Sequence, residues 1–504
     1  MGGMKIRLFY FISILLIILV FISSFQNQPK ESLKSWSTDI QGVGTFSSPR
    51  AADLNKDGVL DIIIGTGKEE FFSVEYGVIA LDGATGDLLW SVAARDQMFG
   101  SAALKDITND AIPDIFIGGR SAELMAINGA NGAIIWEYLA AGDTIPASDF
   151  GLYNFYNPQF IPDQNADGIE DIVVANGGDV RVAPNDPHRP PGSLMVLSGK
   201  DGSLIARDEM PDGKETYLSA IVGDVKGDGT FSIIFGSGGE TIGGHLFRTT
   251  VRDVLQQDLS SAEILASGTD KGFIGPPVFA DITGDNILDI VANAVDGRMI
   301  AIDGLTNDLL WTVEIPNTEA YTSIAVGYFT SDSIPDFFAS YAIGQWPNLG
   351  WSRQFMVNGR TGAVEFTDSL GLYQTSSPVV ADVNHDGIDE AILSVNYQVI
   401  DEFEHAFYYT MLVVIDFKND TITKLGDSFS GINLSSTPWI GDMDNDNLLD
   451  IIYCHTTDST RTYTFDGFQI NRIATDIRIG SEIVWGAYMG SRYDGIFRPN
   501  KSLR

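Results

Sequence analysis

An acidic nine-residue motif recurs along the chain, and this repeat constrains the fold more than any other feature of the sequence. The motif has the pattern D-x-[DNT]-x-D-[GN]-x-x-D, and an apolar run such as 62–64 follows it directly. Eight copies begin at positions 53, 106, 163, 224, 281, 328, 382 and 442, so the period averages about 56 residues. The fourth copy has Ser232 in place of the last carboxylate, and the sixth has Tyr328 in place of the first. A period of this length indicates a repeat architecture in which each unit packs on its neighbours.

A second motif follows the first in most units and predicts the strands around it. It is an Asp-Gly-x-x-Gly turn that leads to a tryptophan, as in Asp82 to Trp90, and Trp136 and Trp311 take the same place in two other units. An apolar strand before the acidic loop, a β-branched strand after it and two strands joined by this turn give four strands in a unit. We expect the three tryptophans to pack between units.

Eight units of four antiparallel strands predict an all-β fold, the eight-bladed β-propeller. An open solenoid is the alternative, but twisted four-stranded antiparallel units favour closure into a ring. Residues 35–37 resemble residues 89–91, which end a unit. We therefore expect the chain to enter the fold with the outer strand of the final blade. The predicted domain is a single propeller with a C-terminal tail over residues 35–504.

Residues 1–25 are predicted to be a signal peptide or an N-terminal membrane anchor that forms one hydrophobic helix, and residues 26–34 are predicted to be a linker. Lys5 and Arg7 precede an apolar run over 8–25 that is long enough to cross a bilayer. We favour an uncleaved anchor because the cleavage pattern is poor, with the bulky Ile22 near the cut; secretion after cleavage is the alternative. The positive flank predicts a propeller outside the cytoplasm, in the periplasm or at the cell surface.

The charge balance and the cysteine count exclude some classes of protein. With 67 acidic and 31 basic residues the formal net charge is −36, so the surface repels phosphate backbones and we expect no nucleic-acid partner. The single cysteine, Cys454, allows no intramolecular disulfide and is expected to be a buried thiol at the end of a strand. Outside the cytoplasm, stability then depends on packing and bound cations.

The acidic loops contain the oxygen ligands that Ca²⁺ prefers. Side-chain oxygens at loop positions one, three, five and nine, with a carbonyl at seven, can surround one ion, and Gly at position six permits the sharp turn. Position twelve of the first copy, Ile64, lies in a strand, so the loop is not an EF-hand. Turn formation alone would explain one such loop, but recurrence in six copies predicts several structural Ca²⁺ sites. We expect no ion in the fourth loop, where Lys226 supplies a positive charge, or in the sixth.

The predicted ligands are Asp53, Asn55, Asp57, Val59 and Asp61 in the first loop; Asp106, Thr108, Asp110 and Asp114 in the second; Asp163, Asn165, Asp167, Ile169 and Asp171 in the third; Asp281, Thr283, Asp285 and Asp289 in the fifth; Asp382, Asn384, Asp386 and Glu390 in the seventh; and Asp442, Asp444, Asp446 and Asp450 in the eighth.

These loops resemble the FG-GAP repeat of the integrin α type, also described as VCBS-like, over nearly all of residues 36–470. The resemblance implies a Ca²⁺-binding β-propeller with its ligands at these same loop positions. The Asp-Gly-Ala-Thr-Gly-x-Leu-x-Trp element at 82–90 and the tail segment 485–496 are similar to quinoprotein-like propellers, which include pyrroloquinoline quinone dehydrogenases and outer-membrane assembly scaffolds. Both resemblances imply an architecture rather than a reaction.

The length variation between units predicts the face that binds a ligand. The insertions 68–76, 142–155, 177–192, 238–244, 342–351 and 398–406 all fall opposite the acidic loops, and repeat proteins place variable binding segments on one face. The candidate ligand residues are Tyr153, Tyr156, Arg181, His188, Arg189, Tyr217, His245 and Arg248. They would suit an anionic or carbohydrate ligand. The alternative is that Arg181 and Arg189 only order a loop by pairing with Asp179 and Asp186.

These patterns favour a non-enzymatic binding, adhesion or scaffold module for a glycan, an envelope component or a partner protein, tethered to a membrane by its N-terminal segment. The five histidines have no metal-ligand spacing, and no nucleophile elbow or phosphate loop occurs. We expect no organic cofactor. Two enzymatic alternatives are a quinone-dependent dehydrogenase, although one cysteine cannot form that family's disulfide, and a carbohydrate-active lyase with Tyr217 or Tyr156 in the funnel. Dye reduction after reconstitution with the quinone and Ca²⁺ would identify the former.

Overall fold

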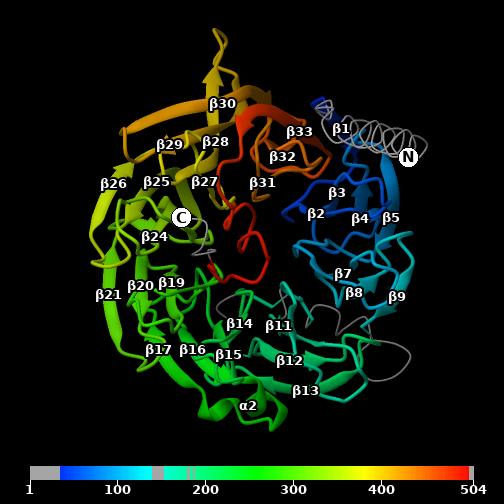
Figure 1. Ribbon diagram of the computed structural model, residues 1–504, viewed down its shortest axis with the longest axis vertical. Coiled ribbons are helices and arrows are strands. Elements are labelled where there is room, and N and C mark those ends of the chain that lie inside the picture. The colour runs from blue at the N-terminus through cyan, green and yellow to red at the C-terminus, as the bar shows by residue number, and fades with distance from the viewer. Residues whose placement is uncertain (1–33, 139–152, 179–181, 184–185, 187, 499–504) are drawn as a thin grey trace, which may run out of the picture.

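The computed structural model describes residues 34–138, 153–178, 182, 183, 186 and 188–498, which form eight antiparallel sheets arranged as a ring (Figure 1). Seven sheets have four strands, and the sixth has a fifth, short strand. The prediction of an eight-bladed propeller with four-stranded antiparallel blades is therefore confirmed. The predicted N-terminal helix over residues 1–25 lies outside the described residues. None of the helices within those residues is long and apolar enough to cross a bilayer.

Each blade is built from strands that follow one another from the axis outward. Blade one is β2 (Arg50–Ala52), β3 (Asp61–Gly65), β4 (Val74–Leu81) and β5 (Leu88–Ala94); blade two is β6 (Ala103–Lys105), β7 (Asp114–Gly118), β8 (Leu124–Ile127) and β9 (Ile134–Glu137). Blade three is β10 (Gln159–Ile161), β11 (Asp171–Asn176), β12 (Ser193–Leu197) and β13 (Leu204–Glu209). Blade four is β14 (Ile221–Asp224), β15 (Phe231–Gly236), β16 (His245–Thr250) and β17 (Glu263–Ser267), with helix α2 (Val251–Leu255) and the 3-10 turn η2 (Leu259–Ser261).

The second half of the ring continues in the same way. Blade five is β18 (Val278–Ala280), β19 (Asp289–Ala294), β20 (Arg298–Ile302) and β21 (Leu309–Glu314); blade six is β23 (Ala325–Gly327), β24 (Asp336–Gln345), β25 (Asn348–Val357) and β26 (Val364–Asp368), with β22 (Thr318–Glu319) also paired to β24. Blade seven is β27 (Val379–Ala381), β28 (Glu390–Ile400), β29 (Ala406–Asp416) and β30 (Thr421–Ser430). Blade eight is β31 (Trp439–Gly441), β32 (Leu448–Thr456), β33 (Gly467–Arg478) and β1 (Trp36–Gln41).

Burial along each blade explains the apolar pattern of its strands. The second strand of a blade lies between two neighbouring blades, so β3 and β7 are buried at every residue. The outermost strand has one solvent-facing side, and β5 alternates between buried and more exposed residues. The core is therefore a stack of sheet-to-sheet contacts around the ring, as expected for strands with continuous β-branched runs.

Residues from both ends of the chain close the ring, as predicted. Strand β1 pairs antiparallel with β33, and Trp36 lies opposite Arg472. The Trp36 indole Nε1 donates to the Gly83 carbonyl of blade one at 2.9 Å. Blade eight is thus completed by the N-terminal strand, which also contacts the next blade (Figure 1).

The recurring tryptophans lie between blades, which confirms their predicted role. Trp90, Trp136 and Trp311 each donate an indole N–H to a carbonyl in the turn of the following blade, at 2.8–2.9 Å. Each ring also covers a glycine of that turn; a Cβ on Gly202, where φ is +72°, would lie 2.5 Å from the Trp136 ring. The second glycine of the Asp-Gly-x-x-Gly turn is therefore needed both for its backbone conformation and for space.

A set of hydrogen bonds joins the blades around the axis, two residues before each inner strand. In each of six links, a backbone N–H donates to a side-chain oxygen of the next blade, at 2.9–3.3 Å. The donor and acceptor pairs are Ser48 and Ser101, Ser101 and Asn157, Asn157 and Ser219, Ser323 and Ser377, Ser377 and Thr437, and Thr437 and Ser48. Blade five has Pro276 at this position and contributes no hydroxyl. These links fix the inner diameter of the ring through neighbouring pairs of blades.

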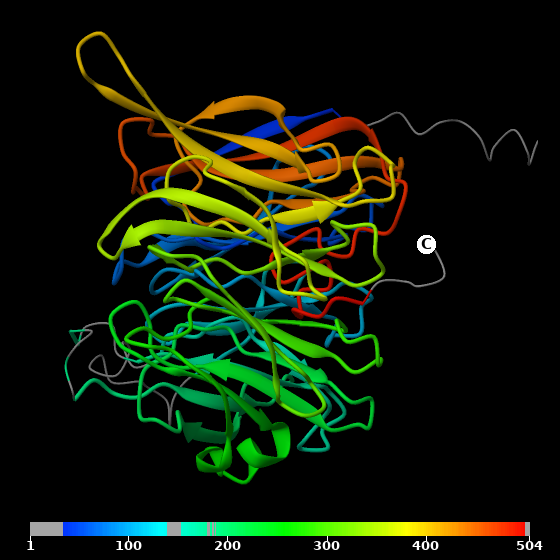
Figure 2. The same cartoon turned by 90° about the vertical axis from the view of Figure 1, so that its left-hand side faces the viewer.

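The C-terminal tail fills the axial channel from the face that carries the acidic loops. Backbone bonds tie it to inner strands of three blades, with Val380 N donating to Trp485 O at 2.9 Å, Ile440 N to Gly486 O at 2.7 Å and Phe279 N to Gly495 O at 2.9 Å. The tail lies at the centre of the ring in Figure 1, and Figure 2 shows it on the side opposite the long β28–β29 hairpin. One end of the channel is therefore closed by the protein's own chain.

Candidate metal centres and axial mouth

Seven of the eight acidic loops share one backbone conformation. Loop positions four and six both have a positive φ, in pairs such as Lys56 and Gly58, or His385 and Gly387. The sixth loop, 328–336, lacks this pair. The fourth loop keeps it at Gly227 and Gly229 although it has lost its last carboxylate. The turn is thus a property of the loop backbone, and it does not require the complete set of acidic residues.

The carboxylate at position nine clamps its loop to the second turn of the same blade. Asp61 is fully buried and accepts the N–H of Leu54 at 2.8 Å and that of Gly83 at 2.9 Å. Asp114, Asp171 and Asp289 are equally buried and accept the corresponding N–H groups. Asp336 is also buried and accepts the N–H groups of Thr330, one loop position later, and of Gly359. Burial raises the pKa of Asp61 to about 6, against the opposing effect of these hydrogen bonds. Position nine therefore has a structural role that does not depend on an ion.

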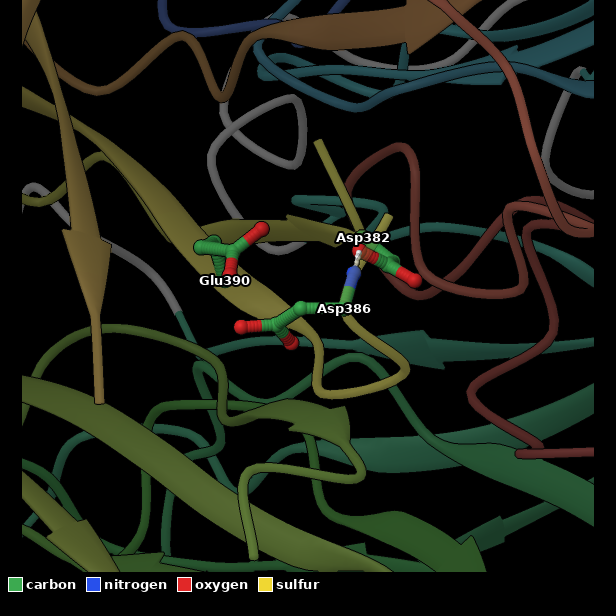
Figure 3. Close-up of side chains that lie close together, drawn as sticks. All are labelled: Asp382, Asp386 and Glu390. Carbon is green, nitrogen blue, oxygen red and sulfur yellow. Dashed lines mark hydrogen bonds between the residues drawn. The ribbon is translucent and has the colours of Figure 1, made fainter. Parts of the chain in front are cut away.

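The seventh loop contains a group of carboxylates that could hold a metal ion (Figure 3). Oxygens of Asp382, Asp386 and Glu390 lie within 4.8 Å of one another, with Glu390 buried at the start of β28. Burial raises the pKa of Glu390 to about 8, and the charges of Asp382, Asp416 and Asp386 add to this rise. The exposed Lys418 pairs with Asp386 at 3.3 Å. Carboxylates that repel one another in this way favour a bound cation.

The eighth loop brings together a second such group, but a buried arginine lies against it. Oxygens of Asp442, Asp444 and Asp450 lie within 4.8 Å of one another. The fully buried Arg472 pairs with Asp444 and Asp450, at 2.9 Å in both cases, and also donates to the Gly83 carbonyl at 3.2 Å. A guanidinium thus supplies part of the positive charge that the sequence pattern had assigned to a metal.

In the remaining predicted loops, the side chains cap their own backbone. Asp53 accepts the Gly58 N–H at 3.1 Å, and Asp57 accepts the Val59 N–H at 2.7 Å. The predicted ligands in loops one, two, three and five remain predictions. Among the described residues, only the seventh and eighth loops gather three acidic side chains closely enough for metal ligation.

On the opposite face, two buried ion pairs and several tyrosines surround the axis; we call this region the axial mouth. Arg189 pairs with Glu215 at 2.7 Å and donates to the Tyr217 hydroxyl at 2.7 Å. Both side chains of this ion pair are buried. Arg189 therefore pairs with Glu215, 26 positions further along the chain, and not with Asp186, the partner in the alternative prediction. Burial raises the pKa of Tyr156, and the ring of Tyr156 contacts Phe99 with centroids 5.3 Å apart.

The second ion pair joins Lys271 to Glu319 at 2.7 Å, with both side chains largely buried. Tyr321 donates its hydroxyl hydrogen to the other Glu319 oxygen at 2.6 Å, and its ring contacts that of Tyr373 at 5.7 Å. Lys271 also donates to the backbone carbonyl of Glu240 at 2.6 Å. A polar network of Glu240, Lys271, Glu319 and Tyr321 therefore joins blade four to blade six, and a ring contact continues it to Tyr373 before blade seven.

The other predicted ligand residues do not join this mouth. Tyr153 packs on Tyr138 and Phe155, and His188 is exposed beside Asp186. His245 bonds to Ser267 within blade four. Arg181 lies outside the described residues.

The assignment of Arg248 to the ligand face was wrong. It lies at the seam between blades four and five, where it donates to the Gly304 carbonyl at 2.8 Å, to Asn307 and to Ser232. Blade four has no tryptophan in its second motif, and Arg248 makes the equivalent contact to the next blade's turn. It therefore belongs to the acidic-loop side.

Sequence reasoning missed an aromatic position that recurs at the mouth. Phe46, Phe99, Tyr217 and Tyr321 each stand four residues before an inner strand, and all are half-buried. The signal was available as an aromatic residue two positions before the Ser that links the blades. Glu240 and Lys271 had no such signal, because each occurs once in a variable loop.

The fold and these sites define an eight-bladed β-propeller with acidic loops on one face and an aromatic mouth on the other. No protein-family model matches the chain. The chain is 21% identical over 400 residues to mouse protein FAM234B and 22% identical to the human protein, with 71% of this chain aligned. The alignment covers 58% of each relative, so the chain spans less than two thirds of their length.

Solved structures show the same fold at low sequence identity. The quinohemoprotein alcohol dehydrogenase ADHIIG from Pseudomonas putida HK5 matches with a TM-score of 0.52 and 11% identity, over 89% of this chain and 77% of that one. The rhamnogalacturonan lyase YesW matches with a TM-score of 0.51 and 12% identity, over 93% and 80%. At this identity the likeness establishes the propeller alone.

Proposed function

We propose that the protein is a Ca²⁺-stabilised, non-enzymatic binding or scaffold module that acts outside the cytoplasm and takes its ligand at the axial mouth. The observation that carries this proposal is the closure of the channel by the tail on the acidic-loop face. A ligand that reaches the axis then has to approach from the other face. That face carries half-buried aromatic side chains, which supply contact area for a glycan or a partner protein.

The acidic loops support the calcium part of this proposal. We infer that they are Ca²⁺ loops of the FG-GAP type. The seventh loop is the strongest site because, within the described residues, its carboxylates pair with the exposed Lys418 rather than with a buried cation such as Arg472. Calcium on this face would clamp the inner and second strands of a blade. It would stabilise the ring without contacting the ligand.

Variants of the two faces test this function. We would screen the ectodomain, residues 35–504, against a glycan array and an extracellular protein panel in calcium-containing buffer. Tyr373→Ala and Tyr321→Ala should abolish binding of whatever ligand the wild type retains. Leu305→Ala, at an exposed position in an acidic-face turn, should leave it unchanged. Ligand binding that survives both tyrosine substitutions but is lost in Leu305→Ala would refute the assignment of the face.

A further inference from the structure

The positive charges at the axial mouth are already paired. Arg189 is bound to Glu215, Lys271 to Glu319, and Arg120 to Glu70 at 2.9 Å. The first two cations are also buried, so an anionic ligand would have to break an ion pair to reach them. These contacts argue against the anionic ligand that the sequence suggested.

One acidic residue at the mouth, Glu240, is held in place by its backbone rather than by its side chain. Gly238 N donates to the Glu215 carbonyl at 2.8 Å, and Lys271 holds the Glu240 carbonyl at 2.6 Å. Gly239 lies against the Tyr217 ring, where a Cβ would be only 2.9 Å from the nearest ring atom. Within the described part of the chain, no hydrogen bond or ion pair reaches the Glu240 carboxylate.

Tyrosines from different blades lie around Glu240. Its neighbour Gly239 packs against the Tyr217 ring, and Lys271, which binds its carbonyl, also binds Glu319, the acceptor of the Tyr321 hydroxyl. Burial is the main cause that raises the pKa of Tyr156, Tyr217, Tyr321 and Tyr373, and the Glu240 charge adds to the rise in each. The four residues are all half-buried. Two of the rings, Tyr321 and Tyr373, meet edge to face at 63°.

We propose that the axial mouth binds its ligand through an ammonium group, which Glu240 and the surrounding tyrosine rings hold together. An unpaired carboxylate beside aromatic faces is the combination that recognises an organic cation, since the charge and the ring quadrupoles both attract it. A neutral sugar can stack on the rings and donate a hydroxyl hydrogen to the carboxylate, but it brings no positive charge to balance it. This inference rests on the proposed function and names the ligand chemistry of the same site.

The test measures binding of tetramethylammonium to the full chain by calorimetry, in calcium-saturated buffer of constant ionic strength. Uncharged tert-butanol, of similar size, should not bind. Glu240→Gln should weaken tetramethylammonium binding about tenfold or more. Glu365→Gln, an exposed acid on outer strand β26, serves as the matched control and should bind like the wild type.

Two further arms separate the role of the rings and the source of the cation. Tyr373→Phe keeps the aromatic face and should retain binding, whereas Tyr373→Leu should lose it. A comparison of glucosamine with N-acetylglucosamine tests whether the ammonium group comes from an amino sugar. Preferential binding of glucosamine would support that source. Binding of tetramethylammonium alone would indicate a different cation. Equal affinity in Glu240→Gln, or no binding of either cation, would overturn the inference. If that result came together with a loss of array binding in Tyr373→Ala and Tyr321→Ala, the proposed function would still hold and only the ammonium inference would fail.

Discussion

Buried charges in this propeller join segments that are distant in the sequence. Arg50 donates to the Tyr488 carbonyl 438 positions away, and Arg472 donates to the Gly83 carbonyl 389 positions away. Arg50 also lies over the Tyr493 ring at 4.1 Å, and burial lowers its pKa to about 10. Such groups stabilise the fold only while their partners stay in place, because an uncompensated buried charge is costly.

Glu123 makes stability depend on pH. Burial raises its pKa from 4.5 to about 7, against the opposing charge of Arg95. As pH rises, the unfolded chain therefore releases this proton before the folded protein does, which favours unfolding. The contribution of protonated Glu123 to the free energy of unfolding is thus fully present below about pH 4.5 and is lost as pH rises through 7. Glu123→Gln cannot titrate.

The unfolding free energy of Glu123→Gln, relative to that of the wild type, should therefore rise by about 3 kcal/mol between those pH values. Urea denaturation of both proteins at a series of pH values measures this difference. A difference that stays constant across the range would show that Glu123 does not titrate in this window.

Arg472 is predicted to substitute for part of the metal charge in the eighth loop. In Arg472→Met, the buried carboxylates of Asp444 and Asp450 lose their guanidinium partner, which should cost about 3–5 kcal/mol in calcium-free buffer. Added Ca²⁺ should then raise the melting temperature of the variant more than that of the wild type.

Lys418→Met provides the comparison. The Lys418 side chain is 48% exposed in its pair with Asp386, so this substitution should lower the free energy of unfolding by less than about 1 kcal/mol. Calorimetry with and without calcium gives both values. If Arg472→Met were as stable as the wild type in chelator, the guanidinium would not be needed to balance the buried carboxylates.

At the scale of elements, the repeat was enough to predict the blades but not their contacts. The period predicted eight units, and residues 35–37 predicted β1 in the last blade, because each depends on a local pattern. The insertions 342–351 and 398–406 were expected as variable loops, yet they extend the β24–β25 and β28–β29 hairpins. The pairing of Arg189 with Glu215 could not be foreseen, since nearer acids looked equally suitable and only the fold brings Glu215 close.

Trp36 should be essential to closure of the ring. It joins β1 to the turn of blade one through Gly83, in the same manner as the other seam tryptophans. Trp36→Ala should lower the unfolding free energy by about 2–3 kcal/mol through the lost packing and the lost hydrogen bond. Trp351→Ala, 58% exposed on a hairpin, should change it by less than about 0.5 kcal/mol. Similar losses in both variants, measured by urea denaturation, would contradict a special role for Trp36.

The two faces of the whole molecule carry different structural features. The acidic loops and the tail occupy one face, where they tie strands together and fill the channel. The aromatic residues of the mouth belong to the other face, where the long β28–β29 hairpin also extends (Figure 2). The full chain has a net charge of −36, so its acidic groups repel one another, and cations bound on the first face would relieve part of that repulsion.

Calcium-dependent thermal unfolding tests the central claim that the acidic loops hold metal. The chelator-treated wild type should melt several degrees higher in Ca²⁺, because each occupied site adds about 2.7 kcal/mol at about 100 times its Kd. Glu390→Gln should lose part of this increase, and elemental analysis should find bound calcium in the wild type. A melting temperature that Ca²⁺ does not change, together with no bound calcium, would contradict the claim.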